Sequence, residues 1–191
     1  MQLSTHLRLA LRLADKLALS GASRAAFLYG NIHPDLFLPT HLTRKPHEHL
    51  EGHSFDFAGK KVLRLIEELK TAALSADTCY RLGKLCHYTA DCFTWPHNPG
   101  YPGSLSAHIS YESILDKRFA DMQTKPCDLP AKITAPEAFF LDAHTAYLKE
   151  EPSLYRDLSY ILAVTERLAF SVGGVCRGVW AEKPVPAEAR S

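Results

Sequence analysis

The chain contains no run of apolar residues long enough to cross a membrane. Its 191 residues are 46% hydrophobic, yet no stretch approaches the roughly 18 consecutive apolar residues that a transmembrane helix needs. The N-terminal segment "MQLSTHLRLALRLADKLALSG" is rich in leucine, but Arg8, Arg12 and Lys16 interrupt it. It therefore lacks the continuous apolar stretch of a signal peptide. We expect a cytoplasmic protein with no transmembrane segment.

Neither sign of charge is in excess. The 22 basic and 21 acidic side chains leave a formal net charge of +1. Proteins that bind nucleic acid or anionic membranes through bulk charge are usually strongly basic. The composition therefore provides no bulk-charge evidence for a nucleic-acid or membrane-surface partner.

The five cysteines include no CxxC pair and are odd in number: Cys79, Cys86, Cys92, Cys127 and Cys176. Disulfide frameworks and zinc ribbons use paired cysteines at short, regular spacings. We therefore interpret these residues as free thiols and exclude both kinds of framework. Cys86 and Cys92 are expected to pack in the core.

Helical periodicity is what the sequence does contain. Apolar residues near the N-terminus recur at the spacing of one helix face: Leu3, Leu7, Ala10, Leu11, Ala14 and Leu17. Similar patterns predict further helices over 24–29, 62–73, 77–95, 108–122, 137–149 and 153–170, with His144 on the surface of its helix. No strand-like alternation persists. We predict an all-α multi-helix bundle, formed by a single domain of residues 1–180 and followed by a disordered tail over 181–191.

A long polar stretch separates the second and third predicted helices. It covers residues 30–57, "GNIHPDLFLPTHLTRKPHEHLEGHSFDF", and contains three prolines and five histidines. Loops of this length inside a compact domain are usually functional. We therefore expect this loop to contribute to the functional site.

Two pairs of polar residues interrupt otherwise apolar helical patterns. Residues four apart on a helix lie on one face, so His87 and Asp91 can point into a shared site. His108 and Glu112 repeat this arrangement on the next predicted helix, and His97 lies on the segment between them. Imidazole nitrogens and carboxylate oxygens are common ligands of zinc. Such pairs also occur as hydrogen-bonded pairs without a metal, and the residues alone leave both interpretations open.

These motifs resemble the core signature of the zinc-dependent phospholipase C family, whose relatives include the fungal single-strand-specific nucleases. That signature is His-x-x-x-Asp, a histidine six residues after the aspartate, and then His-x-x-x-Glu or His-x-x-x-Asp. "GKLCHYTADCFTWPHN" followed by "HISYE" matches it in order. Upstream, "STHLRLA", "YGNIHPDLF" and "EGHSFDF" resemble the family segments that would supply His6, Asp35 and His53. The matches span residues 6–112.

The resemblance implies a mostly helical fold with a cluster of two to three zinc ions. The implied ligands of the first ion are Asp35, His53, His87 and Asp91. Those of the second ion are His97, His108 and Glu112. A third ion would bind His6, Asp91 as a bridge, and the amine and carbonyl of Met1. His47 and His49 stay open as alternatives to His53, because they lie in the same loop.

The function that the resemblance implies is hydrolysis of phosphate esters by a phospholipase C-like phosphodiesterase. A metal-bridged water would be the nucleophile, and Asp35 would accept its proton or orient it. The substrate would be a small-molecule or lipid phosphate ester. Two alternatives stay open: a single-strand nuclease-like phosphodiesterase, and a non-catalytic metal-binding protein that retains the fold. The sequence does not indicate an oligomeric state.

Overall fold

The computed structural model describes residues 1–36, 55–121, 129–130 and 133–173. Within these ranges the chain forms seven α-helices and no strand, which confirms the predicted all-α class. They are α1 (Leu3–Lys16), α2 (Gly21–Leu36), α3 (Phe55–Lys70), α4 (Ala76–Cys92), α5 (Leu105–Asp121), α6 (Pro136–Lys149) and α7 (Leu154–Gly173), with a short 3₁₀ helix η2 (Trp95–His97) between α4 and α5. The predicted tail over 181–191 and residues 37–54 of the predicted loop lie outside the described residues.

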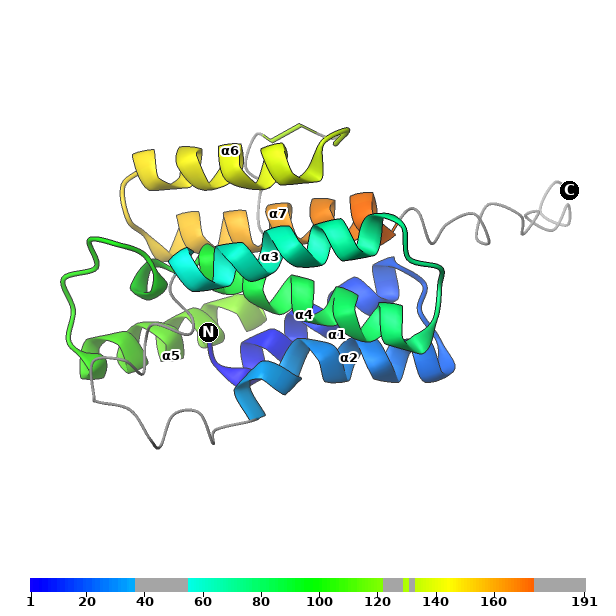
Figure 1. Ribbon diagram of the computed structural model, residues 1–191. Coiled ribbons are helices and arrows are strands. Elements are labelled where there is room, and N and C mark those ends of the chain that lie inside the picture. The colour runs from blue at the N-terminus through cyan, green and yellow to red at the C-terminus, as the bar shows by residue number, and fades with distance from the viewer. Residues whose placement is uncertain (37–54, 122–128, 131–132, 174–191) are drawn as a thin grey trace, which may run out of the picture.

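Helix α4 is the central element of the bundle. It packs against α2, α3 and α7, while α1 and α5 contact each other below it and α6 covers α7 (Figure 1). Every residue of its second half, 85–92, is buried. A helix buried on all sides has no solvent-facing stripe. The polar side chains in this half must therefore find their partners inside the protein.

Two glycines allow α2 and α4 to cross at very short distance. A Cβ atom on Gly30 would lie 2.0 Å from the carbonyl oxygen of Tyr80, and a Cβ atom on Gly83 would lie 2.2 Å from that of Phe27. No larger residue fits between these two backbones without moving them. The crossing brings the last turns of α2 against the second half of α4.

The prediction of a short second helix over 24–29 was wrong. Helix α2 continues to Leu36 and contains Pro34, although proline removes one backbone hydrogen bond from a helix interior. The close contact with α4 stabilises the last turns, and the Tyr80 hydroxyl lies 2.8 Å from Nδ1 of His33. As a result, Asp35 lies in the last turn of a helix rather than in a loop. Helix α3 likewise begins earlier than predicted, at Phe55.

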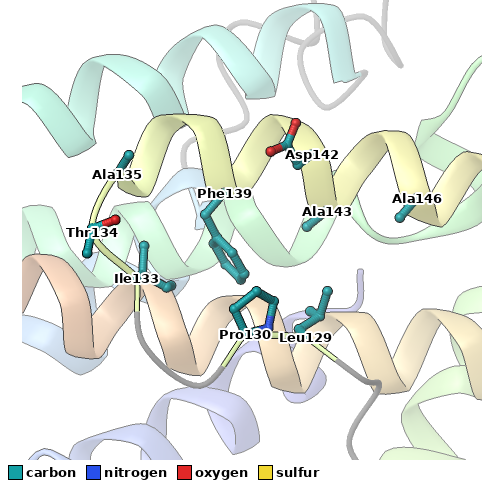
Figure 2. Close-up of a pocket in the computed structure, with 9 residues that line it drawn as sticks. All are labelled: Leu129, Pro130, Ile133, Thr134, Ala135, Phe139, Asp142, Ala143 and Ala146. Carbon is teal, nitrogen blue, oxygen red and sulfur yellow. The ribbon is translucent and has the colours of Figure 1, made fainter.

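An apolar pocket of about 390 Å³ lies between α6 and the described residues at 129–130 and 133–135. Leu129, Ile133 and Phe139 are among the residues that line it (Figure 2). None of the predicted metal ligands lines it. The predicted ligands lie instead around the second half of α4 and the segments that pack against it.

Candidate metal centre

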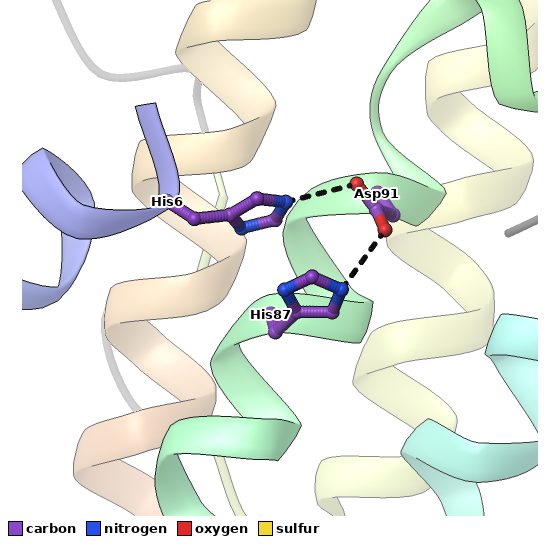
Figure 3. A group of neighbouring side chains, drawn as sticks. All are labelled: His6, His87 and Asp91. Atoms are coloured by element: carbon purple, nitrogen blue, oxygen red, sulfur yellow. Dashed lines mark ion pairs between the residues drawn. The ribbon is translucent and has the colours of Figure 1, made fainter. Parts of the chain in front are cut away.

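The first group of potential metal ligands joins α1 to α4. His6, His87 and Asp91 each direct one ligand atom into a common space, and these atoms lie within 4.8 Å of one another. Nε2 of His6 lies 3.3 Å from Oδ1 of Asp91, and Nε2 of His87 lies 3.3 Å from Oδ2 (Figure 3). The two imidazole rings stack with their centroids 3.9 Å apart. All three side chains are fully buried.

The close crossing of α2 and α4 orients His87. Its Nδ1 lies 2.8 Å from the carbonyl oxygen of Asn31 on α2. A carbonyl oxygen only accepts hydrogen bonds, so Nδ1 donates to it and Nε2 carries the lone pair. Metal-binding histidines are commonly oriented by a hydrogen bond of this kind. The backbone of α2 therefore holds His87 with its lone pair toward the first group.

Asp35, in the last turn of α2, faces both histidines of the first group. Its Oδ1 lies 3.6 Å from Nε2 of His87, and its Oδ2 lies 3.8 Å from Nε2 of His6. The predicted ligands Asp35, His87 and Asp91 thus lie together, with His6 stacked beside them. His53, His47 and His49 lie outside the described residues, so the choice between them stays a prediction.

The second group lies on η2 and α5. One oxygen of Glu112, Oε1, lies 2.9 Å from Nε2 of His97 and 2.8 Å from Nε2 of His108. The ligand atoms of these three residues also lie within 4.8 Å of one another. Unlike the first group, it is not fully buried, because the Glu112 side chain is 14% exposed. The three residues are the set predicted for the second ion.

The two groups meet at Asp91 and at the amino group of Met1. The Met1 nitrogen lies 2.8 Å from Oδ1 of Asp91 and 3.1 Å from Oε1 of Glu112. Nδ1 of His97 lies 3.8 Å from the same Asp91 oxygen. The structure therefore brings together every predicted ligand that it describes, and Asp91 contacts residues of both groups.

The charges of this cluster support one another. Burial raises the pKa of Asp91, but the Met1 ammonium and the three nearby histidines outweigh it and hold this pKa well below its ordinary value. Burial also raises the pKa of Glu112, but Met1 and hydrogen bonds from His108 and His97 lower it far more. Burial lowers the pKa of the Met1 amine, and the charges of Asp91 and Glu112 reverse this effect and raise it to about 11. Both carboxylates are therefore ionised, as metal ligands must be.

The chemistry of the cluster fits zinc. Imidazole and carboxylate groups in sets of three or four form most catalytic zinc sites. His6 adds a second observation: it is fully buried, yet neither of its ring nitrogens forms a hydrogen bond with the described residues. Buried polar atoms in proteins nearly always have a partner. A zinc ion would supply one.

Asp157 on α7 holds the second group in place, although no motif in the sequence points to it. Its Oδ2 accepts a hydrogen bond from the Trp95 amide at 2.6 Å and another from the Tyr111 hydroxyl at 2.8 Å. Trp95 begins η2, which carries His97, and Tyr111 directly precedes Glu112 on α5. The other oxygen, Oδ1, accepts from Tyr147 and Arg156. One buried carboxylate thus positions both segments that supply the second group.

Asn98 and His144 give η2 a second support. The Asn98 amide donates to the carbonyl oxygens of Cys92 and Thr94, and its Oδ1 lies 2.7 Å from Nε2 of His144. His144 was predicted on a helix surface, and this was wrong. It is only 4% exposed and stacks on Phe55 with ring centroids 3.5 Å apart. Its position four residues after Phe140 places it on the apolar face of α6, which is a signal that the sequence contained.

The structure agrees with the expectation for Cys79, Cys86 and Cys92, whereas Cys127 and Cys176 lie outside the described residues. Cys86 and Cys92 are buried free thiols. Burial raises the pKa of both, so neither thiol ionises near neutral pH. They pack in the core and do not compete with the histidines as ligands.

Fold and site together define an all-α protein with a histidine and carboxylate centre suited to zinc. Comparison with protein-family models assigns residues 5–154 to "Zinc dependent phospholipase C". The matched segment covers well over half of the chain, and the chain therefore belongs to the zinc-dependent phospholipase C family. At the level of the family it is a hydrolase whose metal is zinc. No curated protein and no solved structure matched it.

None of the described helices is long and apolar enough to cross a membrane.

Proposed function

We propose that this protein hydrolyses phosphate esters as a zinc-dependent, phospholipase C-like phosphodiesterase. The observation that supports this most directly is the convergence of two groups of histidines and carboxylates on Asp91. Clusters of this kind suit phosphate-ester hydrolysis, because neighbouring metal ions can act on the nucleophile and on the leaving group at the same time. The family assignment supports the same reaction class.

The proposed ligands are those that the resemblance implied. Asp35, His87 and Asp91 would hold one ion together with His53, and His97, His108 and Glu112 would hold another. His6, Asp91 and the Met1 amine would hold a third. The two oxygens of Asp91 support its role as a bridge: Oδ2 faces His87, whereas Oδ1 faces His6 and Met1.

When bound, zinc supplies Lewis acidity at the phosphoryl oxygens and a water molecule whose pKa is lowered toward neutrality. The protein supplies orientation and a proton acceptor. Asp35 is the proposed acceptor, because its carboxylate lies at the first group and its side chain is still 20% exposed. Asn31 holds His87 in one tautomer, and Asp157 holds the segments of the second group.

Zinc content and hydrolysis tests, made on the same preparation, test this proposal. Protein purified without chelator should contain at least about two zinc ions per chain and should hydrolyse bis-p-nitrophenyl phosphate. Chelation should abolish hydrolysis, and added zinc should restore it. Fewer than two ions per chain, or no hydrolysis by the zinc-loaded protein, would contradict the proposal. A phosphatidylcholine analogue and single-stranded DNA in the same screen separate the lipase from the nuclease alternative.

A further inference from the structure

Beside the metal centre, α3 and α4 form a groove of about 330 Å³ with a cationic lining. Four basic side chains line it, namely Lys61 and Arg64 from α3 and Arg81 and Lys84 from α4, together with two acidic ones, Glu68 and Asp77. The phenol rings of Tyr80 and Tyr88 form part of its wall. None of these residues is among the proposed metal ligands.

The two arginines of the groove are neutralised by neighbouring carboxylates. Arg64 pairs with Glu68 at 2.7 Å, and Arg81 pairs with Asp77 at 2.5 Å. Neither lysine forms an ion pair with a carboxylate of the described residues. The net positive charge of the groove therefore resides on Lys61 and Lys84.

Aromatic rings and a hydroxyl hold Lys61 in a defined position. Its Nζ donates a hydrogen bond to the Tyr88 hydroxyl at 3.0 Å and lies 4.3 Å from the ring centroids of both Phe57 and Tyr88. Cation–π contacts of this kind position an ammonium group but do not neutralise its charge. Burial and the charge of Lys84 lower the pKa of Lys61. The two positive charges therefore repel each other, and an anion between them would relieve this repulsion.

Tyr88 links the groove to the metal centre. Its ring packs edge-on against the His87 ring, with centroids 5.1 Å apart. Lys84, Tyr88 and Asp91 follow one another at four- and three-residue spacings and so lie along one side of α4. The helix rise of 1.5 Å per residue puts Lys84 about 10 Å along the axis from Asp91. A phosphodiester whose second anionic group lies about this far from its scissile phosphate would span the two sites.

We propose that this groove binds a second anionic group of the substrate, so that the preferred substrate is a phosphodiester whose alcohol portion carries a further phosphate or carboxylate. The proposal rests on the proposed function, because it assumes that the first phosphate is bound at the metal centre. The same two lysines would repel a quaternary ammonium group, which disfavours choline esters. The groove therefore acts on specificity and leaves the chemical step to the zinc ligands.

Two matched substrate pairs test the proposal. The first pair is phosphatidylinositol phosphate against phosphatidylinositol, both with short, water-soluble acyl chains. The second is glycerophosphoinositol phosphate against glycerophosphoinositol. Within each pair only one phosphate differs. We expect kcat/KM to be higher for the phosphorylated member. A preference in both pairs means that the groove recognises the anion in free and lipid form, and a preference in the lipid pair alone means that it recognises a lipid headgroup. Both outcomes support the proposal.

Substitution of the lysines should remove this preference. In the double variant Lys61→Met, Lys84→Met we expect kcat/KM for the phosphorylated substrates to fall about tenfold or more, as loss of a charge-assisted hydrogen bond does. The unphosphorylated substrates should be unaffected, and so should zinc content and thermal unfolding. Lys84→Glu should lower the preference further. Lys149→Met, at an exposed lysine of α6, is the control and should change nothing.

Bis-p-nitrophenyl phosphate, assayed in parallel, separates failure of this inference from failure of the proposed function. A wild type that hydrolyses it but does not discriminate within either pair overturns the assignment of the groove and leaves the proposed function intact. A preference for the phosphorylated substrates that persists in the double variant also overturns the assignment of the groove and leaves the proposed function intact. A zinc-loaded wild type that hydrolyses none of the five substrates overturns both.

Discussion

The two groups of the metal centre are held in place by different kinds of interaction. The first group is fully buried and depends on backbone packing, since Gly30 and Gly83 let α2 reach His87. The second group is partly exposed and depends on side-chain hydrogen bonds that converge on Asp157. A larger side chain at a glycine would push two closely packed backbones apart, whereas loss of one acceptor would break a hydrogen-bond network. The two groups should therefore respond to different substitutions.

Asp91 contacts both groups, and its substitution should have the largest effect. Asp91→Asn keeps the shape of the side chain but removes the charge that faces Met1, His6 and His87. We expect zinc content to fall in both groups and activity to fall about a thousandfold or more. Metal analysis and hydrolysis of bis-p-nitrophenyl phosphate measure the two effects. Full zinc content in this variant would show that Asp91 does not bridge two ions. The control is Asp142→Asn, at an exposed position of α6, which should leave zinc content and activity unchanged.

Asp157→Asn should impair the second group selectively. The substitution leaves Arg156 and two tyrosine hydroxyls without a charged acceptor in a buried position. We expect a loss of about 3 kcal/mol in the free energy of unfolding, together with a 10–100-fold loss of zinc affinity, which is typical when support of a ligand is removed. Zinc titration against a competing chelator should show one weakened class of site. Equal weakening of all sites would contradict the distinction between the two groups.

Gly30→Ala should impair the first group instead. The added methyl group would overlap the carbonyl oxygen of Tyr80 and push α2 away from α4. We expect the free energy of unfolding to fall by about 1–3 kcal/mol and the zinc sites that involve Asp35 and His87 to weaken. Urea denaturation and the same zinc titration measure these changes. Ala25→Ser, at an exposed position of α2, should stay within about 0.5 kcal/mol of the wild type.

An added residue before Met1 tests the junction between the groups. In a chain that begins at Met1, the amine lies between Asp91 and Glu112. A single glycine placed before it converts this amine, which would bind zinc in its deprotonated form, into an amide that is a poor ligand. We expect one zinc ion fewer per chain and an activity loss of about tenfold. Unchanged zinc content in the extended chain would remove Met1 from the ligand set.

The smallest effect on zinc binding should come from His144, which supports η2 from outside the ligand set. Burial and the charge of Arg156 lower its pKa from 6.5 to about 4. As the pH falls, His144 therefore takes up a proton in the unfolded chain before it does so in the folded one. Its contribution to the free energy of unfolding is fully present above about pH 6.5 and is lost as the pH falls toward about 4. In chelator-treated protein, His144→Gln should reduce the pH dependence of the free energy of unfolding by up to about 1.4 kcal/mol per pH unit. Parallel stability curves for the wild type and the variant would contradict this assignment.

Most helices and the core of the site followed from local spacing. The pairs His87 with Asp91 and His108 with Glu112 are four residues apart, and the helix itself brings such residues together whatever the rest of the chain does. The length of α2 could not be predicted from local spacing, because Pro34 and the polar residues around it indicate a loop. The burial of His144 was missed although the sequence contained a signal for it: His144 lies four residues after Phe140, on the apolar face of α6.

The sequence by itself determined the all-α class and the pairing of His87 with Asp91 and of His108 with Glu112, since both depend on periodicities of a few residues; zinc was implied by the family resemblance. Only the tertiary structure placed His6 against His87, the Met1 amine between two carboxylates, and Asp157 beneath the second group. These contacts join residues far apart in the chain, and they depend on how closely the helix backbones approach. Local spacing contains no information about that approach; at the crossing of α2 and α4, for example, Gly30 and Gly83 set it.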